Sequence, residues 1–245
     1  RSTLSSSSAA SDVYKRQRYG SLNVSDDLCL KVAEGQALGV LGPNGAGKST
    51  MFNLITGDVK ADSGYILFDG QDITCLAPNK RCRLGIGRSY QIPHPFSNMT
   101  VFENLLVGGI FGAEQSEKQA YNACYQVLDE TGLLPKANVL AGSLTLLERK
   151  RLELARALAT SPKLLLLDEI AGGLTDAECQ QLIGTIKSIH DKGTTIVWIE
   201  HVVNALLAVV DSLIVLDFGQ KVAEGEPEAI MNSREVKEIY MGIST

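Results

Sequence analysis

The chain lacks several features that mark large classes of protein. No segment of its 245 residues reaches the about 18 continuous apolar residues that a membrane-spanning helix needs. The net charge of −5 lacks the basic excess of a general nucleic-acid-binding protein, so we expect no nucleic-acid partner. The five cysteines are scattered without a C-x-x-C pair, which favours reduced thiols over disulfides or a zinc site. Together these absences favour a cytoplasmic protein.

The composition is otherwise ordinary, with a hydrophobic fraction of 44% and a charged fraction of 21%. The length suffices for one large domain, or for a domain with an added lobe. Residues 1–11 differ from the rest, because they are rich in serine and alanine and have no apolar periodicity. We expect residues 1–17 to be a disordered tail outside the native sequence, and residues 18–245 to form the folded domain.

The most informative stretch, GPNGAGKS, runs from Gly42 to Ser49 and fits the pattern G-x-x-x-x-G-K-[ST]. It follows the apolar run 37–41 and precedes residues 50–55, which read as a helix. A phosphate-binding loop needs this strand–loop–helix context. The glycines let the backbone wrap so that successive N–H groups point at one anion, and the helix start adds partial positive charge.

Two side chains of this loop carry the chemistry of a nucleotide site. Lys48 can reach the β- and γ-phosphates, and the Ser49 hydroxyl can hold Mg²⁺. The alternative is a glycine-rich turn that binds nothing, but the Lys-Ser pair and the preceding apolar strand disfavour it. We predict a nucleoside triphosphate site formed by Gly42, Pro43, Asn44, Gly45, Ala46, Gly47, Lys48, Ser49 and Thr50.

A second nucleotide element is expected where four leucines, residues 164–167, run into Asp168 and Glu169. Four apolar residues followed by acid predict a strand buried on both faces of a parallel sheet, whose carboxyl end is where such sheets bind ligands. Asp168 is then placed beside the Mg²⁺, and Glu169 is placed to polarise an attacking water. Alone, this run is equally compatible with any strand that enters a helix cap. Joined to the phosphate loop, it favours the functional interpretation.

Short apolar runs alternate with helical stretches, which predicts a parallel α/β sheet. Between Pro93 and Ser161 the strand signals vanish, which predicts an inserted helical lobe of residues 93–160 within a core of residues 18–92 and 161–245. Residues 217–220 read as a hairpin turn. The expected strands are 36–41, 65–68, 163–168, 194–199 and 213–216, and the expected helices are 48–56, 117–131, 148–159, 175–189 and 235–241.

From Arg18 to its end the chain resembles the ATP-binding subunit of an ABC transporter. The resemblance implies a P-loop NTPase core of the RecA-like type, with a helical lobe and an antiparallel β portion, that hydrolyses ATP with Mg²⁺. It assigns Gln91 to the glutamine loop that touches Mg²⁺, His201 to the switch histidine at the γ-phosphate, and Tyr19 to the aromatic that stacks on adenine. Each of these three residues is a weak signal alone, whereas their order and spacing around two strong motifs are specific.

Residues 99–107, 222–227 and 235–242 resemble the ATPases of branched-chain amino-acid importers, although urea and other amide importers use very similar subunits. The resemblance implies two such subunits, identical or different, that face each other with ATP between them. They bind transmembrane permease subunits on the inner face of the cell membrane and serve an external substrate-binding protein indirectly. A chromosome- or repair-type ATPase is disfavoured, because the lobe is too short for a long coiled coil.

Three positions depart from the family pattern. The signature Leu-Ser-Gly-Gly-Gln reads Leu-Thr-Leu-Leu-Glu at residues 144–148, Ile170 replaces a proline, and Thr175 replaces an aspartate. Thr145 keeps the hydroxyl, and the resemblance places Thr145 and Glu148 against the ATP that the other subunit holds. A catalytically weak subunit that pairs with an active one is therefore an alternative.

Overall fold

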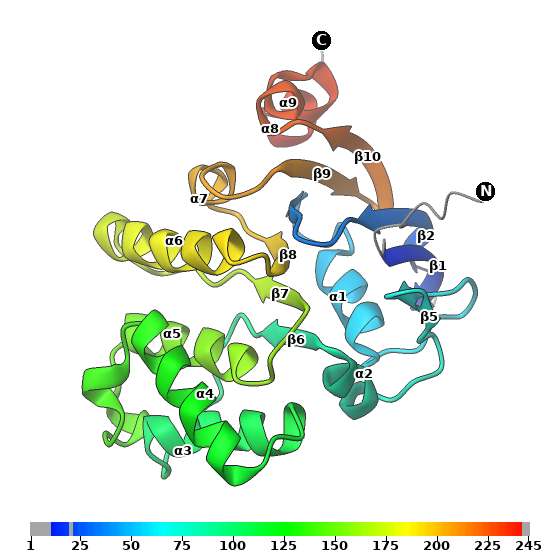
Figure 1. Ribbon diagram of the computed structural model, residues 1–245. Helices are drawn as coiled ribbons and strands as arrows, with labels where there is room; N and C mark the ends of the chain where they lie inside the picture. The colour runs from blue at the N-terminus through cyan, green and yellow to red at the C-terminus, as the bar shows by residue number, and fades with distance from the viewer. Residues whose placement is uncertain (1–10, 20–21, 242–245) are drawn as a thin grey trace, which may run out of the picture.

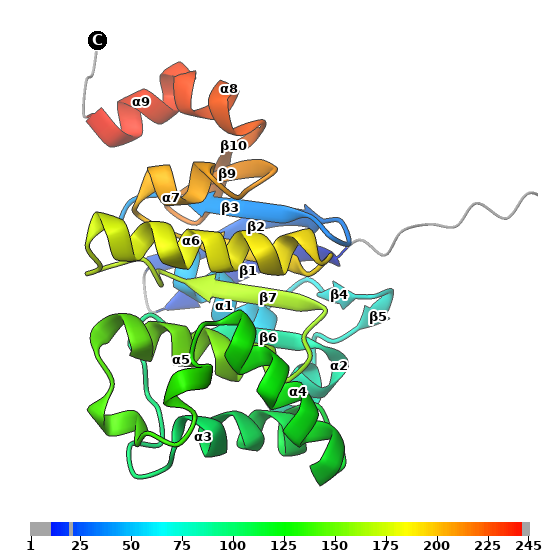
Figure 2. The same cartoon turned by 60° about the vertical axis from the view of Figure 1, so that its left-hand side comes forward.

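A computed structural model describes residues 11–19 and 22–241. Its centre is a six-stranded sheet in the order β10-β9-β3-β8-β7-β6, shown in Figures 1 and 2. The ladders between β9 and β6 are parallel, and β10 pairs antiparallel with β9 through the expected hairpin turn. The strands are β3 (Ala37–Leu41), β6 (Ile86–Ser89), β7 (Leu164–Asp168), β8 (Thr195–Ile199), β9 (Ser212–Asp217) and β10 (Gln220–Gly225). The expected fold class is confirmed.

Helices cover both faces of this sheet, which explains why β7 is apolar throughout. Leu164 and Leu166 pack into a core with α1 (Lys48–Thr56) on one face. Leu165 and Leu167 pack into a second core with α6 (Asp176–Asp191) on the other face. Figures 1 and 2 show the two helices on opposite sides of the sheet. The carboxyl ends of the strands therefore form an edge to which both layers contribute.

The segment between β6 and β7 is helical and carries an apolar core of its own. Leu105, Leu128 and Leu152 are fully buried members of that third core. Figure 1 shows these helices in green below the sheet. The helical segment agrees with the expectation, and its division from the core at Pro93 and Ser161 stays a prediction. The helices are α3 (Val101–Val107), the π-helix Gly108–Gly112, α4 (Glu117–Glu130), the 3-10 turns Leu134–Lys136 and Ala141–Ser143, and α5 (Leu146–Leu158).

Smaller elements complete the described part of the chain, and several of them had no sequence signal. They are β4 (Leu67–Phe68), β5 (Gln71–Asp72), α2 (Pro78–Leu84), α7 (Val203–Leu207), α8 (Pro227–Asn232) and α9 (Arg234–Met241). Within the described ranges, no helix combines the length and the apolar character that crossing a bilayer requires.

The N-terminal region corrects one expectation. Residues 11–19 form strand β1 (Ser11–Tyr19), which pairs antiparallel with β2 (Leu22–Val32), so the expected disorder is wrong for residues 11–17. Composition misled here because a strand gains its hydrogen bonds from a partner in the ladder, and pairing outweighs local propensity. Residues 1–10 lie outside the described residues, and the non-native origin of residues 1–17 stays a prediction.

Candidate active site

The Gly42–Ser49 loop joins the end of β3 to the start of α1 and is shaped by its glycines. Gly42, Gly45 and Gly47 have φ values of 153°, 83° and 98°, in the region that only glycine adopts readily. A Cβ on Gly42 would lie 2.3 Å from the carbonyl oxygen of Leu216 in β9, so the packing of the sheet also demands glycine. The loop thereby wraps at the N-terminus of α1, where backbone N–H groups lack intrahelical partners and can bind an anion.

Lys48 lies buried inside this loop. Its Nζ donates to the carbonyl oxygens of Gly42 at 2.7 Å and of Pro43 at 3.0 Å. Burial lowers the pKa of Lys48, and the charges of Glu169 and Asp168 partly raise it again. A bound phosphate would act in the same direction as these two carboxylates. Of the other loop residues, Ala46 is buried, Pro43, Gly47 and Thr50 are half-buried, and Asn44, Gly45 and Ser49 are exposed.

Gln91, Glu169 and His201, the three residues predicted to be catalytic, contact one another. Gln91 Nε2 donates to Glu169 Oε2 at 2.6 Å, and His201 Nε2 lies 2.8 Å from Glu169 Oε1. They follow the carboxyl ends of β6, β7 and β8, which are adjacent parallel strands, and this is why they converge. The structure therefore brings these side chains together beside the strand β3 that leads into the phosphate loop. Their individual roles stay predictions.

Lys150 supports this cluster from α5 and was missed in the sequence. Glu169 has a φ of 46°, a left-handed conformation that costs a non-glycine residue about 1–3 kcal/mol. The buried Nζ of Lys150 donates to the carbonyl oxygens of Glu169 at 3.2 Å and Gln91 at 3.0 Å. Burial lowers the pKa of Lys150, against the raising effect of Glu200, Glu169 and Asp168. It lies in the basic run 149–151, and a run of charges is usually a solvated face, so no local signal distinguishes it.

Glu200 is a second supporting residue that the sequence did not reveal. It is 1% exposed, and its carboxylate accepts from the backbone N–H groups of Ala171 and His201, each at 3.0 Å. It thus ties the loop after Glu169 to the loop that carries His201. The only sequence signal was its position between a buried strand and the histidine.

The residues predicted to bind Mg²⁺ offer the oxygen ligands that this ion prefers. Asp168 is buried at the end of β7, and Ser49 is exposed in the first turn of α1. Gln91 uses its amide nitrogen toward Glu169, so its amide oxygen is the atom left for a metal. These three residues fit a hard cation that takes its remaining ligands from phosphates and water.

Thr145 and Glu148 are not brought to the phosphate loop. They form a capping box that starts α5: Thr145 Oγ1 accepts from the Glu148 N–H at 3.4 Å, and the Glu148 carboxylate accepts from the Thr145 N–H at 2.9 Å. Glu148 also pairs with Lys136 at 3.2 Å. The hydrogen bond from Thr145, with help from Lys136, lowers the pKa of Glu148. Tyr19 ends β1 opposite Leu22, and its predicted contact with adenine is untested.

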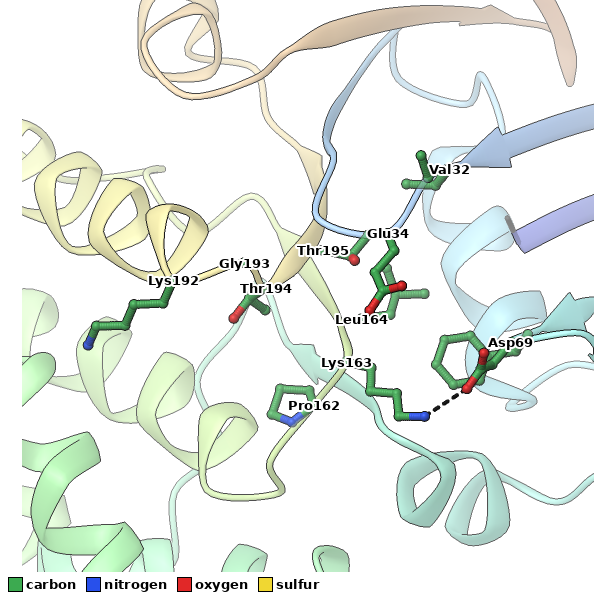
Figure 3. A pocket seen from close by; sticks show the side chains of 12 residues that line it. Val32, Glu34, Asp69, Pro162, Lys163, Leu164, Lys192, Gly193, Thr194 and Thr195 are labelled. Atoms are coloured by element: carbon green, nitrogen blue, oxygen red, sulfur yellow. Dashed lines mark hydrogen bonds and ion pairs between the residues drawn. The ribbon is translucent and has the colours of Figure 1, made fainter. Parts of the chain in front are cut away.

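A separate cavity of about 270 Å³ lies at the opposite edge of the sheet. It is lined by residues at the amino ends of β7 and β8, as Figure 3 shows. Lys163 pairs with Asp69 at 2.7 Å, and Lys192 pairs with Glu130 at 2.7 Å. Both lysines are therefore held in ion pairs with acidic side chains. None of the predicted site residues lines this cavity.

Comparison with known proteins agrees with this geometry. Residues 25–172 match the family model described as ABC transporter. The chain is 36% identical over 242 residues to the high-affinity branched-chain amino acid transport ATP-binding protein BraF of Pseudomonas aeruginosa, covering 92% of this chain and 94% of BraF. It is 34% identical over 224 residues to the lipopolysaccharide export system ATP-binding protein LptB of Haemophilus influenzae, covering 91% of this chain and 93% of LptB.

A solved structure gives the same result. The ADP conformation of MJ1267, an ATP-binding cassette of an ABC transporter, matches with a TM-score of 0.87 and 31% identity, covering 96% of this chain and 99% of MJ1267. The resemblance drawn from the motifs is thereby confirmed. The chain belongs to the ABC transporter family as an ATP-binding cassette, the ATPase that powers transport.

Proposed function

We propose that this chain powers a branched-chain amino-acid importer at the inner face of the cell membrane, using ATP and Mg²⁺. The observation that carries the proposal is the contact of Gln91 and His201 with Glu169, at 2.6 and 2.8 Å, beside the Gly42–Ser49 loop. The similarity to BraF over nearly the whole chain supports the class of substrate.

Binding of ATP rests on the loop and on the residues that face it. Its N–H groups and Lys48 bind the phosphates, Ser49, Asp168 and Gln91 hold Mg²⁺, and Tyr19 stacks on the adenine. When bound, Mg²⁺ neutralises the charge that develops on the phosphate oxygens. Positioning and neutralisation of this kind supply most of the catalysis in phosphoryl transfer.

Hydrolysis requires that the contacts around Glu169 change. Both carboxylate oxygens of Glu169 are engaged, one by Gln91 and one by His201. A carboxylate must have an oxygen free to accept a proton from the attacking water. We infer that the Gln91 amide turns to the metal and the His201 ring to the γ-phosphate, which frees Glu169 for the water.

A second subunit completes the site. At the N-terminus of α5, Thr145 is exposed and Glu148 is half-buried, and the first helix N–H groups lie beside them. In a head-to-tail pair this end approaches the γ-phosphate that Lys48 of the other subunit holds. Backbone N–H groups serve an anion without the family's glycines, provided that the side chains fit. Homodimer and heterodimer both satisfy this arrangement.

The permease is proposed to bind beside the Gln91 loop. A groove of about 330 Å³ lies between α2, β6, α3 and α5. Tyr90 lines this groove, and Tyr90, Ile92 and Phe96 are exposed by 44%, 65% and 45%, so three large apolar side chains of one short segment are accessible to a partner. A cytoplasmic helix of the permease would cover these side chains, and it would also reach the segment that carries Gln91.

Two alternatives follow from specific observations. The altered signature at residues 144–148 favours a catalytically weak subunit that pairs with an active one. The similarity to LptB favours a lipopolysaccharide exporter as a second class of transporter. Within the class of importers, urea or amide import is the nearest variant of branched-chain amino-acid import.

Reconstitution with the genomic partners tests the proposal. The chain is co-purified with its permease, placed in vesicles and assayed for ATPase activity with binding protein plus leucine, urea or lipopolysaccharide. We expect stimulation by leucine alone. Stimulation by urea or by lipopolysaccharide reassigns the substrate, and an inactive homodimer that gains activity with a second ATPase establishes the weak-subunit alternative.

A further inference from the structure

Arg88 in β6 joins the two elements that carry the proposed Mg²⁺ ligands. Its Nη2 donates to Asp168 Oδ2 at the end of β7, at 2.7 Å. Its Nη1 donates to Asn53 Oδ1 at 2.7 Å. Asn53 lies one turn after Ser49 in α1, so the two side chains share a face of that helix. One guanidinium therefore spans from the strand of Asp168 to the helix of Ser49.

The surroundings of Arg88 fix its position. The side chains of Arg88 and Asp168 are only 8% and 7% exposed. The guanidinium also lies 5.5 Å from the ring centre of Phe52 and 4.8 Å from that of Tyr90, within the range of cation–π attraction. A buried charge is costly unless it is paired and hydrogen-bonded. Here the carboxylate of Asp168, that of Asp58 at 3.6 Å, the Asn53 amide and two rings compensate the guanidinium, although its Nε has no hydrogen bond within the described residues. Only the planar fork of arginine can reach both acceptors at once.

The pairing leaves one oxygen of the Asp168 carboxylate available. Oδ2 is taken by Arg88, and Oδ1 has no hydrogen bond within the described part of the chain. With one oxygen held, the plane of the carboxylate is set before any ion arrives. Residues that hydrogen-bond to a metal-coordinating side chain and orient it affect metal affinity strongly, although they do not contact the metal themselves.

We propose that Arg88 is a positioning residue for the Mg²⁺ of the nucleotide site. It sets the orientation of Asp168, and through Asn53 it sets the spacing between β7 and α1 at which Asp168 and Ser49 meet the ion. The inference rests on the proposed function, because it presupposes that ATP binds with Mg²⁺ at these residues.

Nucleotide affinity with and without the metal tests the proposal. The variants are Arg88→Lys, Arg88→Met and Asn53→Ala. Each is titrated with ATP in EDTA and then, at fixed ATP, with Mg²⁺, using calorimetry. We expect both Arg88 variants to need about tenfold more Mg²⁺ for half-saturation, while the affinity in EDTA stays near the wild-type value. Asn53→Ala, which keeps the contact with Asp168, should shift the Mg²⁺ midpoint less.

Arg83→Met is the matched control. Arg83 lies in α2, pairs with Glu114 at 3.0 Å, and has a side chain 45% exposed, so its loss removes an arginine ion pair away from Asp168. Its Mg²⁺ midpoint should equal that of the wild type. If Arg88→Met does not fold, as a thermal melt will show, Arg88→Lys and Asn53→Ala decide.

Two results overturn the inference. One is a wild-type Mg²⁺ midpoint in Arg88→Lys. The other is an equal loss of affinity in EDTA and in Mg²⁺, which indicates a general effect on the fold. A wild-type chain that binds ATP with no dependence on Mg²⁺ contradicts the proposed site itself, and is thereby distinguishable from a failure of Arg88.

Discussion

The ends of β6, β7 and β8 and the start of α5 differ in how their predicted residues are used. At the strand ends, Gln91 and His201 both contact Glu169, and each comes from a different loop. At the start of α5, Thr145 and Glu148 bond to each other in a capping box that any ordinary helix can have. The first region is assembled within one chain, whereas the second is proposed to act in catalysis only when another subunit reaches it.

The difference separates binding from turnover. In the proposed function, binding of ATP needs the loop, Lys48 and the Mg²⁺ ligands, all of which one subunit carries. Efficient phosphoryl transfer also needs charge stabilisation around the γ-phosphate, and the signature end of a second subunit is expected to supply part of it. Changes in the phosphate loop or at the strand ends should therefore alter ATP binding or hydrolysis in an isolated subunit. Changes at the start of α5 should alter hydrolysis only in the assembly.

Glu169→Gln should produce the largest effect. Loss of a general base reduces turnover by about 10²–10⁴-fold, whereas ATP binding should persist because the amide keeps the size of the side chain. Single-turnover hydrolysis measures the rate, and size-exclusion chromatography with ATP detects the trapped dimer. Glu178→Gln, at an exposed helix start, is the control. A variant that stays monomeric and hydrolyses ATP at the normal rate contradicts the role of Glu169.

Lys48→Ala should weaken ATP binding in the isolated subunit. The loss of charge-assisted hydrogen bonds, each worth about 1.5–3 kcal/mol, predicts a fall in affinity of about tenfold to hundredfold or more. Calorimetry on the single subunit measures it, with Lys163→Ala at the opposite edge of the sheet as control. Wild-type affinity in Lys48→Ala means that the loop is not the phosphate site, and the contrast between the two regions then fails.

The sequence predicted the strand ends well because their signals are local and ordered. The predicted helix at residues 48–56 coincides with α1, and the predicted strands 163–168 and 194–199 match β7 and β8 to within one residue. Glu169 and His201 follow these adjacent parallel strands, which share an edge. These signals do not depend on knowing which strand pairs with which. The start of α5 was misjudged by two residues, a usual uncertainty at a helix end.

The supporting residues could not be predicted from the sequence. Strand β6 contains Gly87, Arg88 and Ser89 and has no apolar run, so its sequence gives no strand signal. It forms a strand because it pairs with β7. Arg88 therefore had no assigned position, and its contact with Asp168 spans 80 residues of sequence. Lys150 had no sequence signal either, since nothing local reveals that its ammonium is buried against two carbonyl oxygens. Such contacts depend on tertiary packing.

Restoring glycine at Leu146 and Leu147 tests the assembly side of the contrast. If the signature acts through backbone N–H groups, closer approach should raise ATPase activity with the permease by up to about tenfold, or 1.36 kcal/mol of barrier. The two glycines should cost about 1–2 kcal/mol of stability, because both positions are helical. Steady-state rates with and without permease are compared. Lower rates with the permease mean that the present residues suit their own partner.

Glu148→Gln refines this test with a smaller change. Glutamine still completes a capping box, so α5 should keep its start, while the ion pair with Lys136 and a negative charge near the phosphates are lost. We expect a modest rise in assembled ATPase activity and no change in the affinity of the isolated subunit for ATP. Lys136→Met, which removes the same ion pair and keeps the carboxylate, is the matched variant. A rise in both variants assigns the effect to the ion pair.

Thr145→Ala should lower the stability of the isolated subunit only slightly and leave its ATP affinity unchanged, so that any effect on turnover appears only in the assembly. Loss of the cap costs about 1 kcal/mol and lowers Tm by about 2–4 °C in a domain of this size. Thr100→Ala removes an equivalent cap at the start of α3, where Thr100 and Glu103 form the same box, and should lower Tm equally. Thr145→Ser keeps the hydroxyl and should behave as wild type.

The assembled ATPase rate then separates a cap from a ligand. If the Thr145 hydroxyl reaches the γ-phosphate across the dimer, Thr145→Ala lowers the rate beyond what Thr100→Ala does at matched stability, and Thr145→Ser restores it. Equal rates in the two alanine variants confine Thr145 to its local role. In that case we expect the backbone N–H groups at the start of α5 to make the anion contacts, which they can do without the family's glycines provided that the leucine side chains fit.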